Sequence, residues 1–153
     1  MADAGPWNRR AGGVYAKLAY NYLRATELAT PAGEVVDIPA YVQDEATIYA
    51  EYGLSDRFTA VVDLIGYRWS EIEGFESAGG IGDLRVALQW QVGQKGPSVF
   101  ALRGTVQAPT GDETKGAGLL PTGSGVWEGD VVASAGVSLW RGRGWAQAGL
   151  GPQ

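Results

Sequence analysis

The stretch GDLRVALQWQV, residues 82–92, decides the fold, because polar and apolar residues alternate in it one by one. The polar positions share one parity and the apolar positions the other: Asp83, Arg85, Gln89 and Gln91 against Leu84, Val86, Leu88, Trp90 and Val92. Successive side chains of a β-strand point to opposite faces, so the stretch predicts an amphipathic strand. The alternation alone leaves open whether the apolar face meets a protein core or lipid.

Further segments of the chain carry the same period of two, and none of useful length has the period of an amphipathic helix. The sequence predicts strands at residues 13–25, 41–52, 57–69, 83–92, 98–108, 130–140 and 145–151. With 153 residues the chain has the length of one domain, 1–153, in which residues 1–12 form an N-terminal tail. We therefore expect an all-β protein.

The links between these strands alternate in length along the chain. Long links at 26–40, 70–81 and 109–129 alternate with short links at 53–57, 93–97 and 141–144. Short turns at one end and long loops at the other are typical of up-and-down barrels in outer membranes, whose tilted strands need about 9–11 residues to span the bilayer. The sequence predicts an antiparallel up-and-down transmembrane β-barrel. The odd strand number predicts that the barrel is incomplete.

The composition excludes several classes of function. The chain has no Cys and no His, which removes disulfides, thiolate or imidazole metal sites and Ser-His-Asp triads. Its net charge is −5 with scattered basic residues, so nucleic acid is not an expected partner. The loop PTGDETKG, residues 109–116, lacks the order of a phosphate-binding loop. We expect no catalytic residues, no metal and no cofactor, and hence no enzyme.

The polar parity supplies the candidate site. In a barrel these side chains would line a hydrated lumen with charges of both signs. The predicted lumen-lining residues are Glu45, Glu51, Asp63, Asp83, Arg85, Gln89, Arg103 and Gln107.

Other features bear on location. Aromatic residues cluster near predicted strand ends, as in an interfacial girdle: Tyr52, Tyr67, Trp69, Trp90, Trp140 and Trp145. The N-terminus MADAGPWNRRAGG lacks the apolar core of a secretory signal. We expect an outer-membrane protein whose signal peptide is absent from this sequence because it has been removed.

Three motifs occur in order: YAEYGLSDRFTAVVDL (49–64), GIGDLRVALQW (80–90) and FALRGTVQAPTGDETKG (100–116). In this combination the chain resembles the bacterial outer-membrane barrels of the "meta-pathway of phenol degradation" transporter-like family. That family repeats an E-Y-G-L-[ST]-D-R turn, a G-x-G-D-L strand start and an L-P-T-G-D loop entry, the last with Ala108 in place of Leu here.

The resemblance implies an outer-membrane channel or transporter for small, often aromatic, compounds, and it carries over no catalytic residues. The positions that match the motifs would be turn, lumen or loop-entry positions: Glu51, Asp56, Arg57, Asp83, Thr110, Gly111 and Asp112. Family members are longer and finish on a strand with a terminal aromatic, whereas this sequence finishes at GLGPQ. The expected partners are outer-membrane lipid, a small solute that the sequence does not identify, and other copies of the chain through unpaired edge strands.

Two alternatives fit the same alternation. A soluble β-sandwich or lipocalin-like binding protein would turn the apolar faces inward around a ligand. A self-assembling structural protein would pair its free edges with neighbouring copies. Strand length and the rhythm of the links favour the barrel over the soluble sandwich, whereas the assembly alternative depends on whether the sheet keeps free edges.

Overall fold

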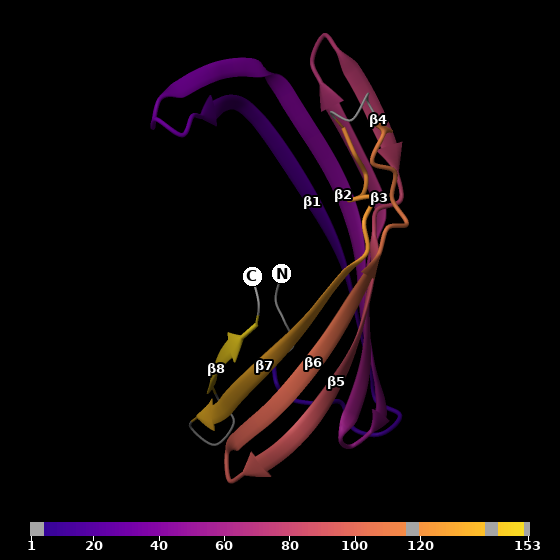
Figure 1. Ribbon diagram of the computed structural model, residues 1–153, viewed down its shortest axis with the longest axis vertical. Helices are drawn as coiled ribbons and strands as arrows, with labels where there is room; N and C mark the ends of the chain where they lie inside the picture. Colours follow the sequence, from indigo (N-terminus) through magenta and orange to yellow (C-terminus); the bar gives the residue numbers. More distant parts are fainter. Residues whose placement is uncertain (1–4, 116–119, 140–143, 152–153) are drawn as a thin grey trace.

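The computed structural model describes residues 5–115, 120–139 and 144–151, which form a single antiparallel sheet (Figure 1). The strands are β1 (Val14–Ala29), β2 (Val35–Ser55), β3 (Phe58–Ile72), β4 (Glu76–Gly80), β5 (Leu84–Lys95), β6 (Ser98–Ala108), β7 (Glu128–Leu139) and β8 (Gly144–Leu150). They lie in the order β1-β2-β3-β5-β6-β7-β8, and β4 pairs with the far end of β3. The predicted all-β fold with up-and-down connections is confirmed. In the described part of the chain no helix is long and apolar enough to cross a membrane.

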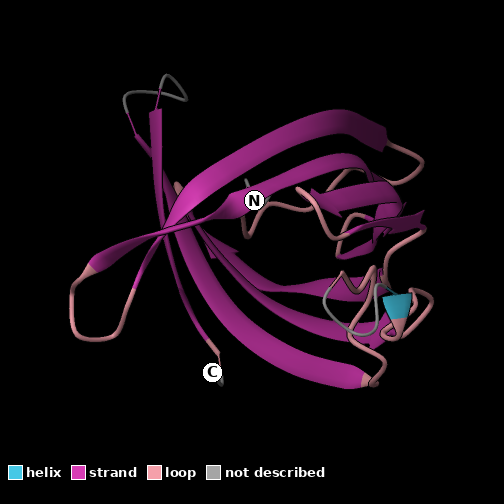
Figure 2. Cartoon of the chain, turned by 90° about the horizontal axis from the view of Figure 1, so that it is seen from above, coloured by secondary structure: helices cyan, strands magenta, loops and turns pink. Residues whose placement is uncertain are grey.

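The sheet curls into a half-barrel. Seen from above, it forms an open curve (Figure 2). Among the described residues, β1 pairs only with β2 and β8 only with β7, so the sheet does not close on itself. This agrees with the expectation of an incomplete barrel.

The register sorts the side chains into rows that run across the sheet. One row passes from Leu18 through Ile48 and Leu64 to Leu84, and it consists of the apolar parity of four strands. The neighbouring row on the other face passes through Lys17, Tyr49, Asp63 and Arg85. The alternation read from residues 82–92 therefore holds across most of the sheet.

The exposed fractions of the side chains distinguish the convex face of the sheet from the concave face. Large apolar side chains of the first parity stand free on the convex face, with Leu18 at 79% and Leu88 at 47% exposed. The polar parity lies on the concave face, where Glu51 and Gln89 are each 2% exposed. The accessible surface is 9995 Å², against about 7,400 Å² expected for a folded soluble monomer of 16.1 kDa. Much of the excess is apolar surface that nothing in the described chain covers.

The first long link is mostly strand, which corrects the prediction for residues 26–40. β1 and β2 continue as a hairpin to Ala29 and Val35, so that only residues 30–34 form a turn, where Gly33 adopts a φ of 84°. Pro39 lies within this part of β2, although a proline cannot donate a ladder hydrogen bond. It falls where the β1–β2 register shifts and beyond the residues of β2 that pair with β3, so no ladder needs its N–H.

The third strand also differs from its prediction. The β2–β3 register shifts between Ala46 and Thr47, because Thr47 pairs with Ile65 and Ala46 with Tyr67, leaving Gly66 as the extra residue. Such a bulge reverses which face the following side chains meet. Tyr67, which has the same parity as Asp63 in the sequence, is therefore exposed on the convex face, and Arg68, which pairs with Glu45, takes the concave position. The predicted link 70–81 contains the end of β3 and the whole of β4.

Candidate functional site

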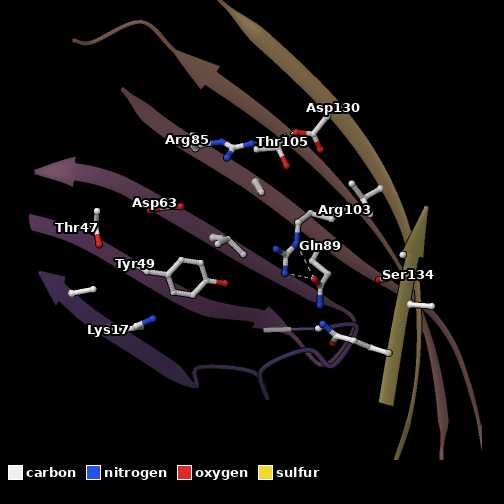
Figure 3. Close-up of a pocket in the computed structure, with 18 residues that line it drawn as sticks. Lys17, Thr47, Tyr49, Asp63, Arg85, Gln89, Arg103, Thr105, Asp130 and Ser134 are labelled. Carbon is white, nitrogen blue, oxygen red and sulfur yellow. Dashed lines mark hydrogen bonds and ion pairs between the residues drawn. The ribbon is translucent and has the colours of Figure 1, made fainter. Parts of the chain in front are cut away.

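The concave face holds a cavity of about 560 Å³ that side chains from both halves of the sheet line. Figure 3 shows polar side chains from β1, β2, β3, β5, β6 and β7 directed into this shared space. They are Lys17, Thr47, Tyr49, Asp63, Arg85, Gln89, Arg103, Thr105, Asp130 and Ser134. Small residues such as Ala87 and Gly149 lie between them and leave the space open.

Charges of both signs meet on the middle strands of the cavity. Asp63 and Arg85 face each other across the β3–β5 pair. The Arg85 guanidinium also lies 3.6 Å from the carboxylate of Asp130 on β7. Its Nε is buried and has no hydrogen-bond partner within the described residues. Arg85 is therefore paired with Asp130, lies opposite Asp63 in the strand register, and keeps one donor unsatisfied.

Arg103 on β6 is held by a side chain of the adjacent strand. Its Nε and Nη2 donate to the Gln89 carbonyl oxygen at 3.0 Å and 2.7 Å. Since Gln89 is 2% exposed, this pair of hydrogen bonds lies buried on the concave face of the sheet and not in solvent. The guanidinium charge is thereby placed against the cavity in one orientation.

Glu45 lies nearer the long-loop end of the concave face, and it does not line the cavity. Arg68 donates to one of its carboxylate oxygens from Nε at 3.0 Å and from Nη2 at 2.7 Å. Arg68 also reaches the carbonyl oxygen of Thr122, in the link between β6 and β7, at 3.4 Å. This pair connects the sheet to the link that covers it.

Asp83, just before β5, holds the same link in place. Its carboxylate accepts hydrogen bonds from the backbone N–H of Gly111 at 3.1 Å and of Ser124 at 2.7 Å, and from the side-chain amide of Gln107 at 3.1 Å. Burial opposes ionisation of Asp83, but the hydrogen bonds from Ser124 and Gly111 outweigh it and lower the pKa of this carboxyl below its ordinary value. Figure 1 shows the link passing beside β3 and β4.

Glu51 lies at the opposite end, close to the tight turns. It is buried against the N-terminal segment, where it forms an ion pair with Arg9 and accepts a hydrogen bond from the Tyr49 hydroxyl at 2.6 Å. The residues before β1 were predicted to be a tail. Instead, residues 5–10 cross the concave face, and their backbone and side chains bond to the sheet.

The eight predicted lumen residues all lie on or beside the concave side, but the structure gathers only some of them. Asp63, Arg85, Gln89 and Arg103 line the main cavity. Gln107 borders an adjoining cavity of about 80 Å³ beside Glu128. Glu51 and Asp83 bind the segments that fold over the two ends, and Glu45 holds Arg68, which in turn bonds to one of these segments.

The prediction missed several residues of the site. Lys17, Thr105 and Asp130 line the cavity, and the parity of their strands already placed them with the polar set. Arg68 was hidden by the bulge at Gly66, which no period-two pattern reveals. Arg9 carried no signal, because a single extended segment has no periodicity to detect.

The expected aromatic girdle is only partly on the convex face. Tyr52, Tyr67 and Trp90 are exposed there, and Trp90 stacks on Phe58 with ring centroids 6.3 Å apart. Trp145 is different: it pairs with Ser138 on the concave parity and contacts Trp7 edge-on at 6.0 Å. Trp140 lies outside the described residues.

Chemically, this surface can solvate polar and charged groups, since it offers carboxylates, guanidinium groups, amides and hydroxyls around one open space. Within the described residues no group of three or more metal-ligating side chains converges. No protein-family model, curated protein or solved structure matches the chain.

Proposed function

We propose that this chain forms part of the wall of an outer-membrane β-barrel channel. Small, often aromatic, compounds pass through this channel along the polar concave face. The observation that carries the proposal is the sidedness of the sheet. Large apolar side chains lie exposed on the convex face, and polar side chains line a cavity on the concave face. A soluble binding protein with its apolar faces around a ligand would have the reverse arrangement.

The dimensions of the convex face support the proposal. Aromatic side chains stand exposed at two levels, with Tyr52 and Trp90 near the tight turns and Tyr22 and Tyr67 toward the long-loop end. From Tyr52 to Asp44, which pairs with Tyr22, β2 extends roughly 26 Å along its own axis at about 3.3 Å per residue. At the tilt of about 40° found in such barrels, this length corresponds to a height of about 20 Å. Outer-membrane barrels carry an apolar band about 25 Å tall between two aromatic girdles. The order of the three sequence motifs, which resembles the phenol-degradation transporter-like family, agrees with this class.

The open edges of β1 and β8 add an element to the proposal. A closed pore needs every strand edge paired, because unsatisfied backbone groups are costly in lipid. We include self-association of the chain through these two edges in the proposal. Cross-linking in detergent and light scattering measure it, and a strictly monomeric protein that still conducts ions would contradict this element.

The test is conductance of the refolded chain in bilayers of outer-membrane lipid, with a large side chain placed on either face of β5. Ala87 lines the cavity and its neighbour Val86 is exposed on the convex face. Ala87→Trp should lower the conductance because the indole fills the cavity. Val86→Trp is the matched control and should leave the conductance unchanged, because lipid accommodates the same ring.

Two results would overturn the proposal. One is a chain that stays soluble and monomeric without detergent and does not enter vesicles. The other is a chain that inserts and conducts but whose conductance responds equally to Ala87→Trp and Val86→Trp. Flux of small phenols and of benzoates into vesicles then measures which compounds pass.

A further inference from the structure

We propose that residues 5–10 are a plug that is seated in a cradle on the concave face and narrows the tight-turn end of the cavity. The plugging role rests on the proposed channel function, whereas the seat itself can be tested without it. The segment reaches from β2 and β3, where Arg9 binds, to β7 and β8, where Pro6 and Trp7 pack. It therefore spans the half-barrel from one side to the other.

Glycines make the room for this segment. A Cβ at Gly53 on β2 would lie 2.0 Å from the carbonyl oxygen of Arg10. A Cβ at Gly136 on β7 would lie 2.6 Å from Pro6 Cγ and 2.7 Å from Trp7 Cη2. Neither glycine has a positive φ, so the close approach of the segment, not a turn, explains the missing side chain. Pro6 is less than 2% exposed in this seat.

Polar contacts fix the segment along its length. The backbone N–H of Arg9 donates to the Thr59 hydroxyl at 3.0 Å, and the side-chain amide of Gln89 donates to Asn8 Oδ1 at 3.0 Å. The Arg9 guanidinium pairs with Glu51 and lies 4.5 Å from the centre of the Tyr15 ring. The sheet groups are deeply buried under the segment, with Glu51, Thr59 and Gln89 each 2% exposed. Without the segment, each would lose its partner there.

The seat overlaps the cavity at its tight-turn end. Gly5 lines the cavity together with two residues of the sheet, Gln89 and Gln147. The side-chain amide of Gln89 donates to the backbone carbonyl oxygen of Trp7, and the Gln147 side chain lies close to Gly5. At the other end, the link held by Asp83 and Arg68 folds inward. A solute that moves along the concave face therefore meets residues 5–10, and the segment has to leave its seat for the solute to pass.

The seat is tested by thiol labelling, which is clean because the chain has no Cys. Pro6→Cys places a single thiol in the seat, and Lys95→Cys, at the exposed end of β5, is the reference position. In the folded full-length chain, a charged, membrane-impermeant maleimide should label position 6 at least about tenfold more slowly than position 95. Adding Arg9→Gln, or separately Gly136→Val, should raise the rate at position 6 by at least about tenfold and leave the rate at position 95 unchanged.

Conductance tests the plugging role in the same bilayers. Arg9→Gln and Glu51→Gln should each raise the conductance, by about twofold or more if the seated segment narrows the path. The double variant should add nothing, because either change alone removes the same ion pair. Lys95→Gln is the control that removes a positive charge outside the seat.

Each failure has a distinct meaning. Fast labelling at position 6 in the presence of Arg9 would overturn the seat. Labelling that rises in Arg9→Gln without any rise in conductance would overturn the plug while the channel stands. Absence of conductance in every variant, with labelling as expected, would overturn the channel and the plug together, and the seat would stand.

Discussion

Adjacent residues of β5 differ sharply in what surrounds them. Val86 and Leu88 project from the convex face with no covering segment, whereas Gln89 and Arg103 beneath them are bonded to each other at 3.0 Å and 2.7 Å. Every segment that folds back onto the sheet, residues 5–10 and the link after β6, does so on the concave side. The comparison teaches that the chain itself satisfies its polar face, whereas no segment among the described residues covers its apolar face.

The sharpest way to break this comparison is to place a charge on the convex face. Val86 lies between the two aromatic levels, so in the proposed barrel Val86→Arg puts a guanidinium near the bilayer midplane. The expected cost is about 2–4 kcal/mol in the free energy of unfolding, measured by urea titration of the chain in vesicles. Leu88→Arg, one row nearer to Trp90, should cost less because the penalty falls toward the interface.

One outcome would contradict the expected decrease in cost from Val86→Arg to Leu88→Arg. If the convex face is covered by protein and not by lipid, Val86→Arg and Leu88→Arg should be equally destabilising, with no gradient. Ala87→Arg serves as the control, because this position faces the polar cavity. It should leave the free energy of unfolding within about 1 kcal/mol of the original chain.

The sequence predicted the two faces better than it predicted the ends of the sheet. Alternation specifies parity strand by strand, and parity placed Asp63, Arg85 and Arg103 correctly on one face. It fails at Gly66, where one extra residue reverses the faces and hides Arg68. It also fails for Arg9, whose place depends on the shape of the assembled sheet and on glycines far away in the chain. Which face is concave is likewise a property of the whole curled sheet and not of any one strand.

Acid should release the link after β6 from the long-loop end of the polar face, because protonation of Asp83 weakens the hydrogen bonds that hold this link. Asp83 lies in the link before β5, and hydrogen bonds from Ser124 and Gly111 lower its pKa in the folded chain despite its burial. In the unfolded chain the pKa is about 3.9, so the stabilisation is complete above about pH 4 and is lost as the pH falls through the lower folded pKa. Proteolysis of the link after β6, followed as a function of pH, measures this release.

Asp83→Asn isolates the contribution of this carboxylate. Removing the charge should cost about 1–3 kcal/mol, because hydrogen bonds to charged groups contribute about 1.5–3 kcal/mol each and an amide replaces them only in part. The variant should also lose the acid-dependent step. Asp112→Asn is the matched control, since the Asp112 carboxylate has local partners in the described chain, Thr114 and Lys115 within its own turn, and leaves the sheet uncontacted. A link equally protected from protease in Asp83→Asn and the original chain would contradict this role.

The smallest expected change in stability comes from the ion pair inside the cavity. Its larger expected effect is on the ion selectivity of the polar face. Arg85 and Asp130 lie 3.6 Å apart with both side chains partly exposed, so breaking the pair should cost only about 0.2–1 kcal/mol. The charge of the cavity changes nevertheless, because both residues line it.

Asp130→Asn should shift the reversal potential in a salt gradient toward anion selectivity, and Arg85→Gln should shift it toward cation selectivity, since fixed lining charges attract ions of the opposite sign. Glu34→Gln, in the turn between β1 and β2, makes the same change of charge as Asp130→Asn but away from the cavity, and it should leave the reversal potential unchanged. Shifts of the same sign in Asp130→Asn and Arg85→Gln would mean that ions do not pass along the concave face, because only residues that line the path impose their own sign on it.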